Sequence, residues 1–387
     1  MANAPPTEKN AFLFDLSLAE AKAKQAVSKD RANAADSVFN QCWIPFLAGL
    51  GLNDPFLSDI DDKIPILRVF AQRLREGRIS RSGKPIKSPH VRDEILRVAK
   101  AYTDMGLQDP RLTKQGLMDP RLTALYKAYA NEDPAPVRVK PIPLQVIQQA
   151  QQLINENSTE LDRATMDMTW LGFFYMLRPG EHCKSNDNSP LQLKDVTLTI
   201  GHRKLNIFTD DMADIVRATH CSLTFDTQKN RVRGEVIGHG RSGHSIMCPT
   251  QTLIRRIKYL LSHNAQPSTP LCATKHNNRW KYVTSKLISA TLKVATTALP
   301  HLNYNVTDVS ARSLRSGGAM ALICGNIDKD RIQLQGRWKS DAIFRYLHAQ
   351  ALPLVHNLAS VMLQHGSFTL LPGQDIPLEA QHIVDPL

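Results

Sequence analysis

The chain has 387 residues, of which 42% are hydrophobic and 22% charged, and its formal net charge at pH 7 is +12. This composition is typical of a globular protein with room for two domains, and no apolar run is long enough to cross a bilayer. The basic excess favours a polyanionic partner, although charge alone does not separate a nucleic acid from a membrane surface. The six cysteines form no C-x-x-C pair, so we expect reduced thiols in an intracellular protein, without disulfides or a zinc site.

The first third of the chain is predicted to be helical after a disordered start. Residues 1–15 are rich in Pro and Ala and lack the pattern of a secretory signal, so we expect them to be disordered. From there to residue 130 the apolar residues recur with helical spacing, as Phe39, Trp43 and Phe46 do. The expected helices run over about 34–50, 61–77 and 89–105, and the last should bury Ile95, Leu96, Val98 and Ala99.

A basic stretch, residues 73–87, lies between the second and third of these helices. It contains one acidic residue, Glu76, and six basic ones: Arg73, Arg75, Arg78, Arg81, Lys84 and Lys87. A run of charge is often only solvated surface. Because helices flank this one in a basic protein, we expect it to contact the phosphates of a nucleic acid.

A short duplication and a proline-rich segment follow. The sequence DPRLT begins at Asp109 and again at Asp119, a period too short and a copy number too low for a repeat architecture. Residues 131–143 hold four prolines and are typical of an extended linker. The chain is thus expected to contain a helical domain over residues 16–130, then the linker, then a larger domain.

The larger domain should combine helices with a small antiparallel sheet. Helices are predicted over about 144–156, 159–177, 251–263 and 286–298. Short alternating segments, typical of strands, cover 196–200, 205–208, 221–225 and 235–237. The link between the last two strands carries Lys229 at its tip, with Arg231 and Arg233 close by.

The most informative block runs from Val306 to His348 and predicts three short helices, over about 310–324, 328–336 and from 341 onward. Arg312 and Arg315 stand three residues apart on the first helix, a spacing that places two side chains on one face. Trp338 follows in a turn, and Tyr346 is the last tyrosine of the chain. Two like charges at this spacing would repel each other, and a bound dianion would reverse the sign of that effect.

The segments R-S-L-R-S-G-G, G-R-W-K-S-D and R-Y-L-H of this block resemble the catalytic end of the tyrosine recombinases, the phage-integrase family of DNA breaking-and-rejoining enzymes. The resemblance implies Arg315 as the second catalytic arginine, Trp338 at the family's His/Trp position and Tyr346 as nucleophile. Arg312 stands where the family usually has histidine. Within the family the sequence is most similar to integrases of eukaryotic mobile elements of the Crypton type.

Two further positions match the family's order. Arg178 lies in an L-R-x-x-E pattern, where the resemblance implies the first catalytic arginine, steered by Glu181. Lys229 corresponds to the family's hairpin lysine, which would protonate the leaving 5′ oxygen. The tyrosine would store the bond energy as a phosphodiester to protein, and arginines would stabilise charge on the phosphate oxygens. The resemblance implies neither a metal ion nor a cofactor, and His182, Cys183, His239 and His244 match no zinc spacing.

Taken singly, each of these residues has an ordinary structural interpretation. Arg178 could be a helix-end charge, Lys229 a solvated hairpin charge, Trp338 a core anchor and Tyr346 one apolar position of an amphipathic helix. The arginines of R-S-L-R-S-G-G could merely flank a helix that needs its glycines for close packing. Their order and spacing together favour the catalytic interpretation.

The expected fold is mainly α with a small antiparallel β-sheet. Residues 16–130 would form a helical, SAM-like core-binding domain, 144–365 a catalytic domain and 366–387 a C-terminal tail. The expected partners are double-stranded DNA and three further copies of the chain in a tetramer on paired sites, with no membrane contact. The expected location is inside the cell with DNA, which is nuclear in a eukaryote.

Two other functions fit the same residues. A descendant of such an enzyme could bind specific DNA without cutting it, because an arginine at position 312 cannot accept the tyrosine proton at neutral pH. A type IB topoisomerase shares the tyrosine and the arginines but relaxes supercoils without pairing sites. Formation of a covalent adduct distinguishes a recombinase from the non-cutting binding protein. Relaxation of a plasmid without a target sequence distinguishes the topoisomerase from a recombinase.

Overall fold

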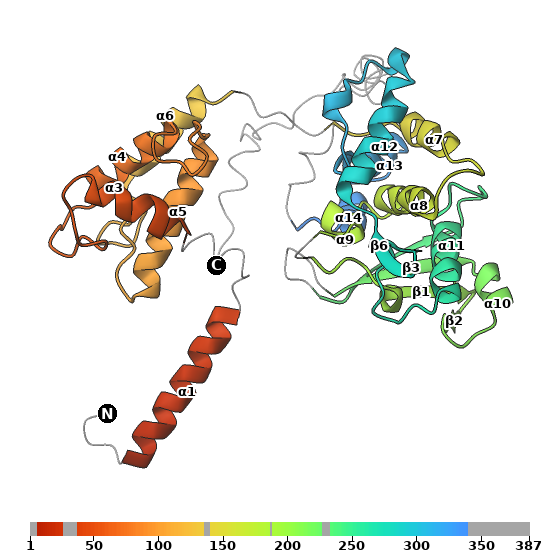
Figure 1. The fold of residues 1–387 in the computed structure, drawn as a ribbon, viewed down its shortest axis with the longest axis horizontal. Coiled ribbons are helices and arrows are strands. Elements are labelled where there is room, and N and C mark those ends of the chain that lie inside the picture. The colour runs from red at the N-terminus through yellow and green to blue at the C-terminus, as the bar shows by residue number, and fades with distance from the viewer. Residues whose placement is uncertain (1–5, 26–36, 135–139, 186–187, 227–232, 340–387) are drawn as a thin grey trace, which may run out of the picture. The chain divides into compact units, whose positions relative to one another are not determined.

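The computed structural model describes residues 6–25, 37–134, 140–185, 188–226 and 233–339. The chain divides into two compact units, Met1–Pro136 and Val137–Leu387 (Figure 1). Lys229, Tyr346, the helix expected from residue 341 onward and the tail 366–387 lie outside the described residues. Among the helices that the structure describes, none is long and apolar enough to cross a membrane.

All the regular elements that the structure describes in the N-terminal unit are helices. Its elements are α1 (Pro6–Gln25), the π-helical turn η1 (Phe39–Trp43), α3 (Ile44–Ala48), α4 (Ile64–Arg75), α5 (Ser88–Asp104) and α6 (Pro120–Glu132). The expectation of disorder over residues 1–15 is corrected for residues 6–15, which belong to α1. The whole of α1 has no proline after its first residue and is rich in Ala, Leu and Lys, which favour helix.

An aromatic cluster forms the centre of this unit. The rings of Trp43 and Phe70 meet edge to face with centroids 5.0 Å apart, and Phe46 lies 5.1 Å from Phe70. The indole of Trp43 donates a hydrogen bond of 2.8 Å to the carbonyl of Pro55, so its polar atom is satisfied. Leu96 was expected to be buried but is 47% exposed, because it lies about 100° round the helix from the fully buried Ile95.

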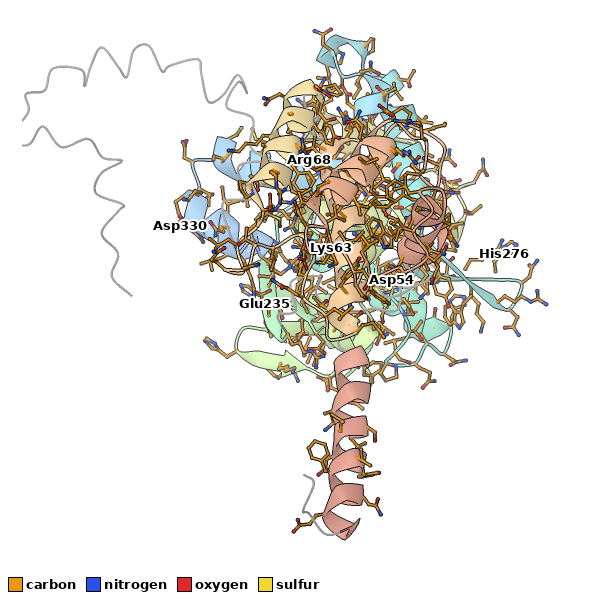
Figure 2. The ribbon with its side chains drawn as sticks, turned by 90° about the vertical axis from the view of Figure 1, so that its left-hand side faces the viewer. Asp54, Lys63, Arg68, Glu235, His276 and Asp330 are labelled. Carbon is orange, nitrogen blue, oxygen red and sulfur yellow. The ribbon has the colours of Figure 1, made fainter. Side chains whose placement is uncertain are left out.

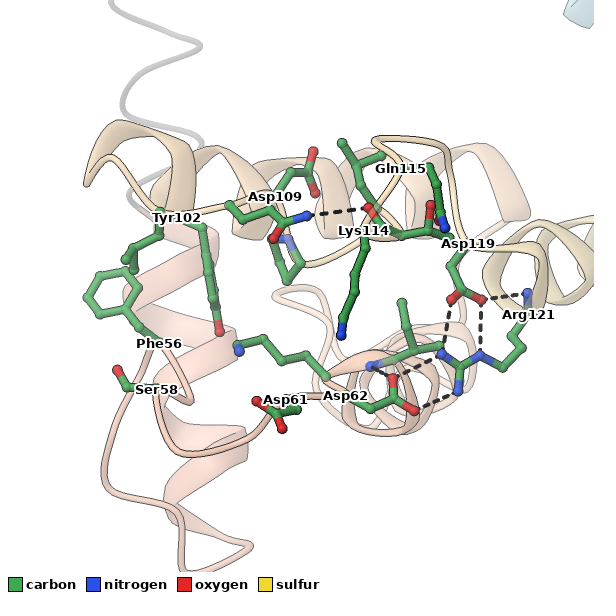
Figure 3. Close-up of a pocket in the computed structure, with 17 residues that line it drawn as sticks. Phe56, Ser58, Asp61, Asp62, Tyr102, Asp109, Lys114, Gln115, Asp119 and Arg121 are labelled. Atoms are coloured by element: carbon green, nitrogen blue, oxygen red, sulfur yellow. Dashed lines mark hydrogen bonds and ion pairs between the residues drawn. The ribbon is translucent and has the colours of Figure 1, made fainter.

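The duplicated DPRLT segment has a structural role in both copies. In each copy the aspartate binds the arginine two residues later, at 2.6 Å for Asp109 with Arg111 and 3.0 Å for Asp119 with Arg121. Asp119 also caps α6, since its side chain accepts from the backbone N–H of Arg121. Both copies line one hollow of about 610 Å³ (Figure 3).

The C-terminal unit is built round a buried helix, α8 (Glu160–Phe174). The remaining helices are α7 (Leu144–Gln152), α9 (Pro179–His182), α10 (Met212–Arg217), α11 (Pro249–Ser262), α12 (Ser285–Thr297), α13 (Ser313–Cys324) and α14 (Lys329–Gly336), with short 3-10 turns at Leu193–Asp195, Pro300–Leu302 and Val306–Asp308. A capping box of Thr159 and Asp162 begins α8. The helix is covered by α7, α11, α12 and α13 (Figure 1), as the apolar residues of its second half predict.

A four-stranded antiparallel sheet of order β2-β1-β3-β4 completes the core. Its strands are β1 (Val196–Ile200), β2 (Arg203–Leu205), β3 (His220–Phe225) and β4 (Glu235–Gly240). The mainly helical fold with a small antiparallel sheet is therefore confirmed. The prediction of a strand over 205–208 is wrong, because β2 ends at Leu205. The side chain of Asn206 then accepts a hydrogen bond from the backbone N–H of Phe208 and forms a turn.

A separate hairpin of β5 (Ala273–His276) and β6 (Arg279–Tyr282) was not predicted from the sequence. Asn277 and Asn278 connect the strands with positive φ values of 47° and 60°. Asparagine tolerates this left-handed conformation, which two-residue hairpin turns require. The helix α10 was also not predicted, because its six residues are too few to show a period.

Candidate active site

Arg178 is presented by a strained turn at the end of α8. Met176 has a φ of 47°, unusual for a residue with a side chain, and the chain then extends through Arg178 into α9. The carboxylate of Glu181 accepts two hydrogen bonds of 2.8 Å from Arg178, one from its backbone N–H and one from its Nη1. The side chain of Arg178 remains 28% exposed. Glu181 thus orients Arg178 and leaves part of its guanidinium accessible to a ligand.

Arg315 reaches the same turn from α13 and is 3% exposed. Its Nη1 donates to the carbonyl of Met176 and its Nη2 to the carbonyl of Gly336 at 2.6 Å. Its guanidinium also lies 4.1 Å from the ring centroid of Trp338. Arg315 therefore ties the end of α8 to the end of α14 and is stacked on the predicted tryptophan.

A third arginine, Arg337, belongs to this group and was not singled out from the sequence. Arg337 adopts a left-handed conformation after α14, with a φ of 58°, and is only 3% exposed. Its Nη2 lies 2.8 Å from Glu181, and its guanidinium lies 3.8 Å from the ring centroid of Phe225. The G-R-W sequence marks this position, but no periodicity indicates that the arginine turns inward.

Glu181 is the common counter-charge of this arginine cluster, which consists of Arg178, Arg315 and Arg337. Burial would raise the pKa of its carboxyl, but the charge of Arg337, the N–H and charge of Arg178 and the charge of Arg315 together hold that pKa below its usual value. Two guanidiniums thus bind one carboxylate, and the charge of a third acts on it. The cluster has an excess of positive charge, the electrostatic requirement of an anion-binding site.

The glycines of R-S-L-R-S-G-G allow α13 to pack closely. A Cβ on Gly318 would lie 2.3 Å from the carbonyl oxygen of Phe173, and one on Gly317 would lie 2.6 Å from that of Ile142. A Cβ on Gly336 would overlap the ring of Trp338 at 1.5 Å. The structural interpretation of the two glycines is therefore correct, and the same packing brings Arg315 to the end of α8.

Arg312 lies in a different environment from Arg315. It is exposed at the N-cap of α13, and its side chain forms no hydrogen bond or ion pair with a described residue. The three-residue spacing thus gives one inward and one outward arginine. Placement of Arg312 beside Tyr346 and Lys229 stays a prediction, because those two residues are outside the described ranges.

Two segments that carry predicted catalytic residues begin at the arginine cluster. Phe225, which contacts Arg337, is the last residue of β3, from which the link with Lys229 departs. Trp338, which contacts Arg315, directly precedes the segment with Tyr346. The described residues therefore bring together Arg178, Arg315 and Trp338, and place the starting points of the other two segments beside them.

Two histidines line the inner side of the turn. His182 is buried, donates from Nδ1 to the carbonyl of Arg178 at 3.0 Å, and has its pKa lowered by burial to about 4. His239 on β4 donates to the carbonyl of Phe174 at 2.9 Å, and burial lowers its pKa as well. Both stay neutral and fix the backbone that presents Arg178. Within the described ranges, no group of His, Cys, Asp and Glu side chains is arranged to hold a metal ion.

The residues of the basic stretch divide into internal and external groups. Arg75 is 17% exposed, pairs with Asp133 and donates to the carbonyl of Ile86 at 3.0 Å, so it links α4 to the end of α6. Arg73 stacks on Phe46, and Arg78 and Arg81 pair with Glu76 and Glu94. Lys84 and Lys87 are exposed and have no ion pair with a described residue.

The hollow between the DPRLT copies contains charges that largely neutralise one another (Figure 3). Arg121 is shared between Asp62 at 2.7 Å and Asp119 at 3.0 Å, and Lys63 donates to the carbonyl of Ile60 at 2.6 Å. No residue predicted to be functional from the sequence lines it. We interpret this hollow as a structural feature of the helical unit.

No protein-family model and no curated protein matches the chain. Among solved structures, a lambda integrase (75-356) dimer bound to a COC′ core site matches with a TM-score of 0.47 and 15% identity over 86% of this chain and 93% of that one. XerH site-specific recombinase bound to palindromic difH substrate matches with a TM-score of 0.46 and 13% identity over 80% and 74%. The Tn1549 transposon integrase in complex with transposon right end DNA gives 0.42 and 11% over 79% and 86%.

Proposed function

We propose that this chain is a tyrosine recombinase, a DNA strand transferase that cleaves and rejoins duplex DNA through a 3′-phosphotyrosyl intermediate. The observation that supports it most is the arginine cluster. Arg178 and Arg315, two of the three arginines that the sequence motifs single out, meet at one turn, because Arg315 donates to the carbonyl of Met176, 139 residues earlier in the chain. Glu181 binds Arg178 directly, and the buried Arg315 is held against the carbonyl of Met176 in the same turn.

The proposed reaction starts with a scissile phosphate at the exposed edge of Arg178. Tyr346 Oη attacks phosphorus, the bond from phosphorus to the 5′ oxygen breaks, and Lys229 gives its proton to that oxygen. Arg178 and Arg315 neutralise the charge that develops on the non-bridging oxygens, and the indole N–H of Trp338 donates to one of them. Attack by a free 5′ hydroxyl reverses these steps, so the ester conserves the bond energy.

Arg312 acts in this proposal as a further phosphate clamp at the start of α13. Its guanidinium stays charged and cannot accept the tyrosine proton. A phosphate oxygen or water accepts it instead. This position is the part of the site most open to test, because histidine is the residue usual there in the resembling family.

The remaining assignments follow from this function. Residues 16–130 form the helical DNA-binding domain, 144–365 the catalytic domain, and four copies assemble on paired sites. Exposed residues of the basic stretch contact DNA phosphates, with Lys84 and Lys87 foremost. We assign the chain to the integration or excision of a mobile element of the eukaryotic Crypton type, on the sequence block alone, and place it with DNA inside the cell.

The test uses a nicked duplex from the DNA that flanks the gene, since the nick lets the cleaved fragment diffuse away and traps the intermediate. The wild-type protein should give an adduct that survives SDS, and Tyr346→Phe should give none. Tyr304→Phe, a half-buried tyrosine in the same unit, is the matched control and should form the adduct normally. Absence of any wild-type adduct on duplexes that the protein binds tightly would overturn the proposal.

One observation favours a second candidate, a DNA-binding protein that no longer cuts. Arg312 is exposed at the family's histidine position, where it supplies charge without a base. For this candidate we expect tight duplex binding without an adduct, and an adduct on Arg312→His. For strand transfer by the natural chain we expect an adduct in both proteins. Relaxation of a plasmid without a target sequence would instead indicate a type IB topoisomerase.

A further inference from the structure

The hairpin β5–β6 extends outward from the C-terminal unit. In Figure 2 its outer end carries the labelled His276. The strands pair in the register His276 with Arg279 and Lys275 with Trp280, so only Asn277 and Asn278 form the turn. Both asparagines are exposed. The result is a narrow two-stranded ribbon with side-chain amides at its tip.

Every ionisable side chain from residue 275 to residue 281 is basic: Lys275, His276, Arg279 and Lys281. None of the four forms an ion pair with any residue that the structure describes. Like charges that gather on one hairpin repel each other, and a bound polyanion reverses that effect. The charge of the hairpin therefore favours an anionic partner outside this chain.

The two faces of the ribbon differ because successive residues of a strand alternate in direction. One face carries His276, Arg279 and Lys281. The other carries Lys275, whose ammonium lies 5.7 Å from the ring centroid of Trp280. A cation on each face suits a ribbon that lies between two rows of negative charge.

We propose that the hairpin β5–β6 enters the major groove of duplex DNA and reads its sequence. Lys275 and Lys281 contact the phosphate rows on either side, while Asn278 and Arg279 reach base edges. A major groove about 12 Å wide admits a two-stranded ribbon. Asparagine pairs with adenine and arginine with guanine through two hydrogen bonds each. The inference rests on the proposed function for its partner and assigns to this hairpin the choice of DNA site.

Other anionic partners fit the hairpin less well. The major groove of duplex RNA is too deep and narrow for side chains to read, so a ribbon of this kind does not enter it. An acidic protein surface would match the charges but would leave the amides at the tip without a specific role. Duplex DNA uses both the charges and the amides.

The test separates base reading from charge. Asn278→Gly removes the amide but keeps the positive φ, because glycine is favoured at that turn position. Arg279→Lys keeps the charge but removes the planar fork. Arg203→Lys is the matched control: the same exchange in the other exposed hairpin, β1–β2, where the arginine is already paired with Asp214. Each protein selects duplexes from a random-sequence pool, and its affinity is then measured for the wild-type-selected duplex and for the unselected pool.

We expect Asn278→Gly and Arg279→Lys each to reduce the preference for the selected duplex by about 5- to 150-fold, the effect of losing one two-bonded base contact. Affinity for the unselected pool should change by less than about twofold, because phosphate contacts supply it. Arg203→Lys should behave as the wild type does.

Three outcomes would overturn the inference: an unchanged preference in both hairpin variants, a parallel loss of affinity for both pools, or a wild-type protein that prefers duplex RNA. The proposed function is tested separately, by whether the covalent adduct forms. A protein that selects sequences through this hairpin without forming an adduct would refute strand transfer alone. Adduct formation with unaffected hairpin variants would refute the hairpin assignment alone.

Discussion

At the scale of single residues, the arginine cluster depends on the negative charge of one buried carboxylate. Glu181 orients the half-buried Arg178 and neutralises part of the charge of the fully buried Arg337. Such an arrangement is stable only while both signs are present, because a buried charge without a partner is costly. Loss of Glu181 should therefore affect folding and phosphate binding together.

We expect Glu181→Gln to lower the free energy of unfolding by roughly 3–5 kcal/mol, the usual cost of breaking a buried ion pair from one side. Chemical denaturation of the two proteins measures it. Glu160→Gln is the control: its carboxylate is 50% exposed in a pair with Arg163 and should cost less than about 1 kcal/mol. Similar losses in the two variants would show that Glu181 does not carry the role assigned to it.

The buried His182 predicts a dependence of stability on pH. Burial lowers its pKa to about 4 in the folded protein from an ordinary value of 6.5, so the unfolded chain binds the proton more readily. Its contribution is present above pH 6.5 and is lost as pH falls toward 4, by about 3 kcal/mol in total. Denaturation of wild type and His182→Gln over this range should show a smaller pH dependence in the variant. Equal slopes would contradict the assignment.

At the scale of elements, the sequence predicts best where a local signal and a tertiary contact agree. The helices predicted from residues 159 and 328 begin at the capping residues Thr159 and Asp328, and the apolar second half of α8 is buried except for the partly exposed Phe174. The hairpin β5–β6 was missed because its strands alternate basic and apolar residues too briefly to show a period. Arg337 was missed because its inward turn depends on a left-handed backbone after Gly336, which no spacing rule indicates.

The packing of α13 against α8 gives a prediction at the same scale. Gly318→Ala places a methyl group against the backbone oxygen of Phe173, which cannot move aside without shifting α8. We expect the free energy of unfolding to fall by roughly 1–3 kcal/mol, measured by thermal denaturation. The yield of the covalent adduct should fall as well, because Arg315 moves with α13. Gly325→Ala, at the end of the same helix with its nearest atoms at 3.3 Å, is the control and should be nearly neutral. A neutral Gly318→Ala would mean that the two helices are not as close as described.

At the scale of the whole molecule, a net charge of +12 would supply the attraction for the proposed DNA partner, while a few placed residues would determine the proposed chemistry. The sequence predicted the basic stretch as one surface, but its arginines differ. Arg75 is engaged inside the N-terminal unit, whereas Lys84 and Lys87 are exposed and without ion pairs among the described residues. The sequence gives the number of charges, but only the fold shows which of them are neutralised by ion pairs within the protein.

This division predicts different outcomes for variants of the basic stretch. Replacing both Lys84 and Lys87 with Gln should weaken binding to any duplex and reduce the slope of log affinity against log salt by about 2, one for each phosphate contact. Arg75→Gln should instead destabilise the N-terminal unit and leave that slope unchanged at temperatures where the unit is folded. Titrations at several salt concentrations measure the slope. An unchanged slope in the double variant would remove these lysines from the DNA interface.

The most direct test of the account is to identify the residue that becomes linked to DNA. The protein is incubated with a nicked duplex from its own flanking DNA, digested with protease, and the nucleotide-bearing peptide is sequenced by mass spectrometry. We predict a phosphodiester to Tyr346, formed by wild type and reduced by at least about 100-fold in Arg178→Ala and Arg315→Ala, since each removes a guanidinium from the transition state. A link to any other residue, or full adduct yield without those arginines, would contradict the account.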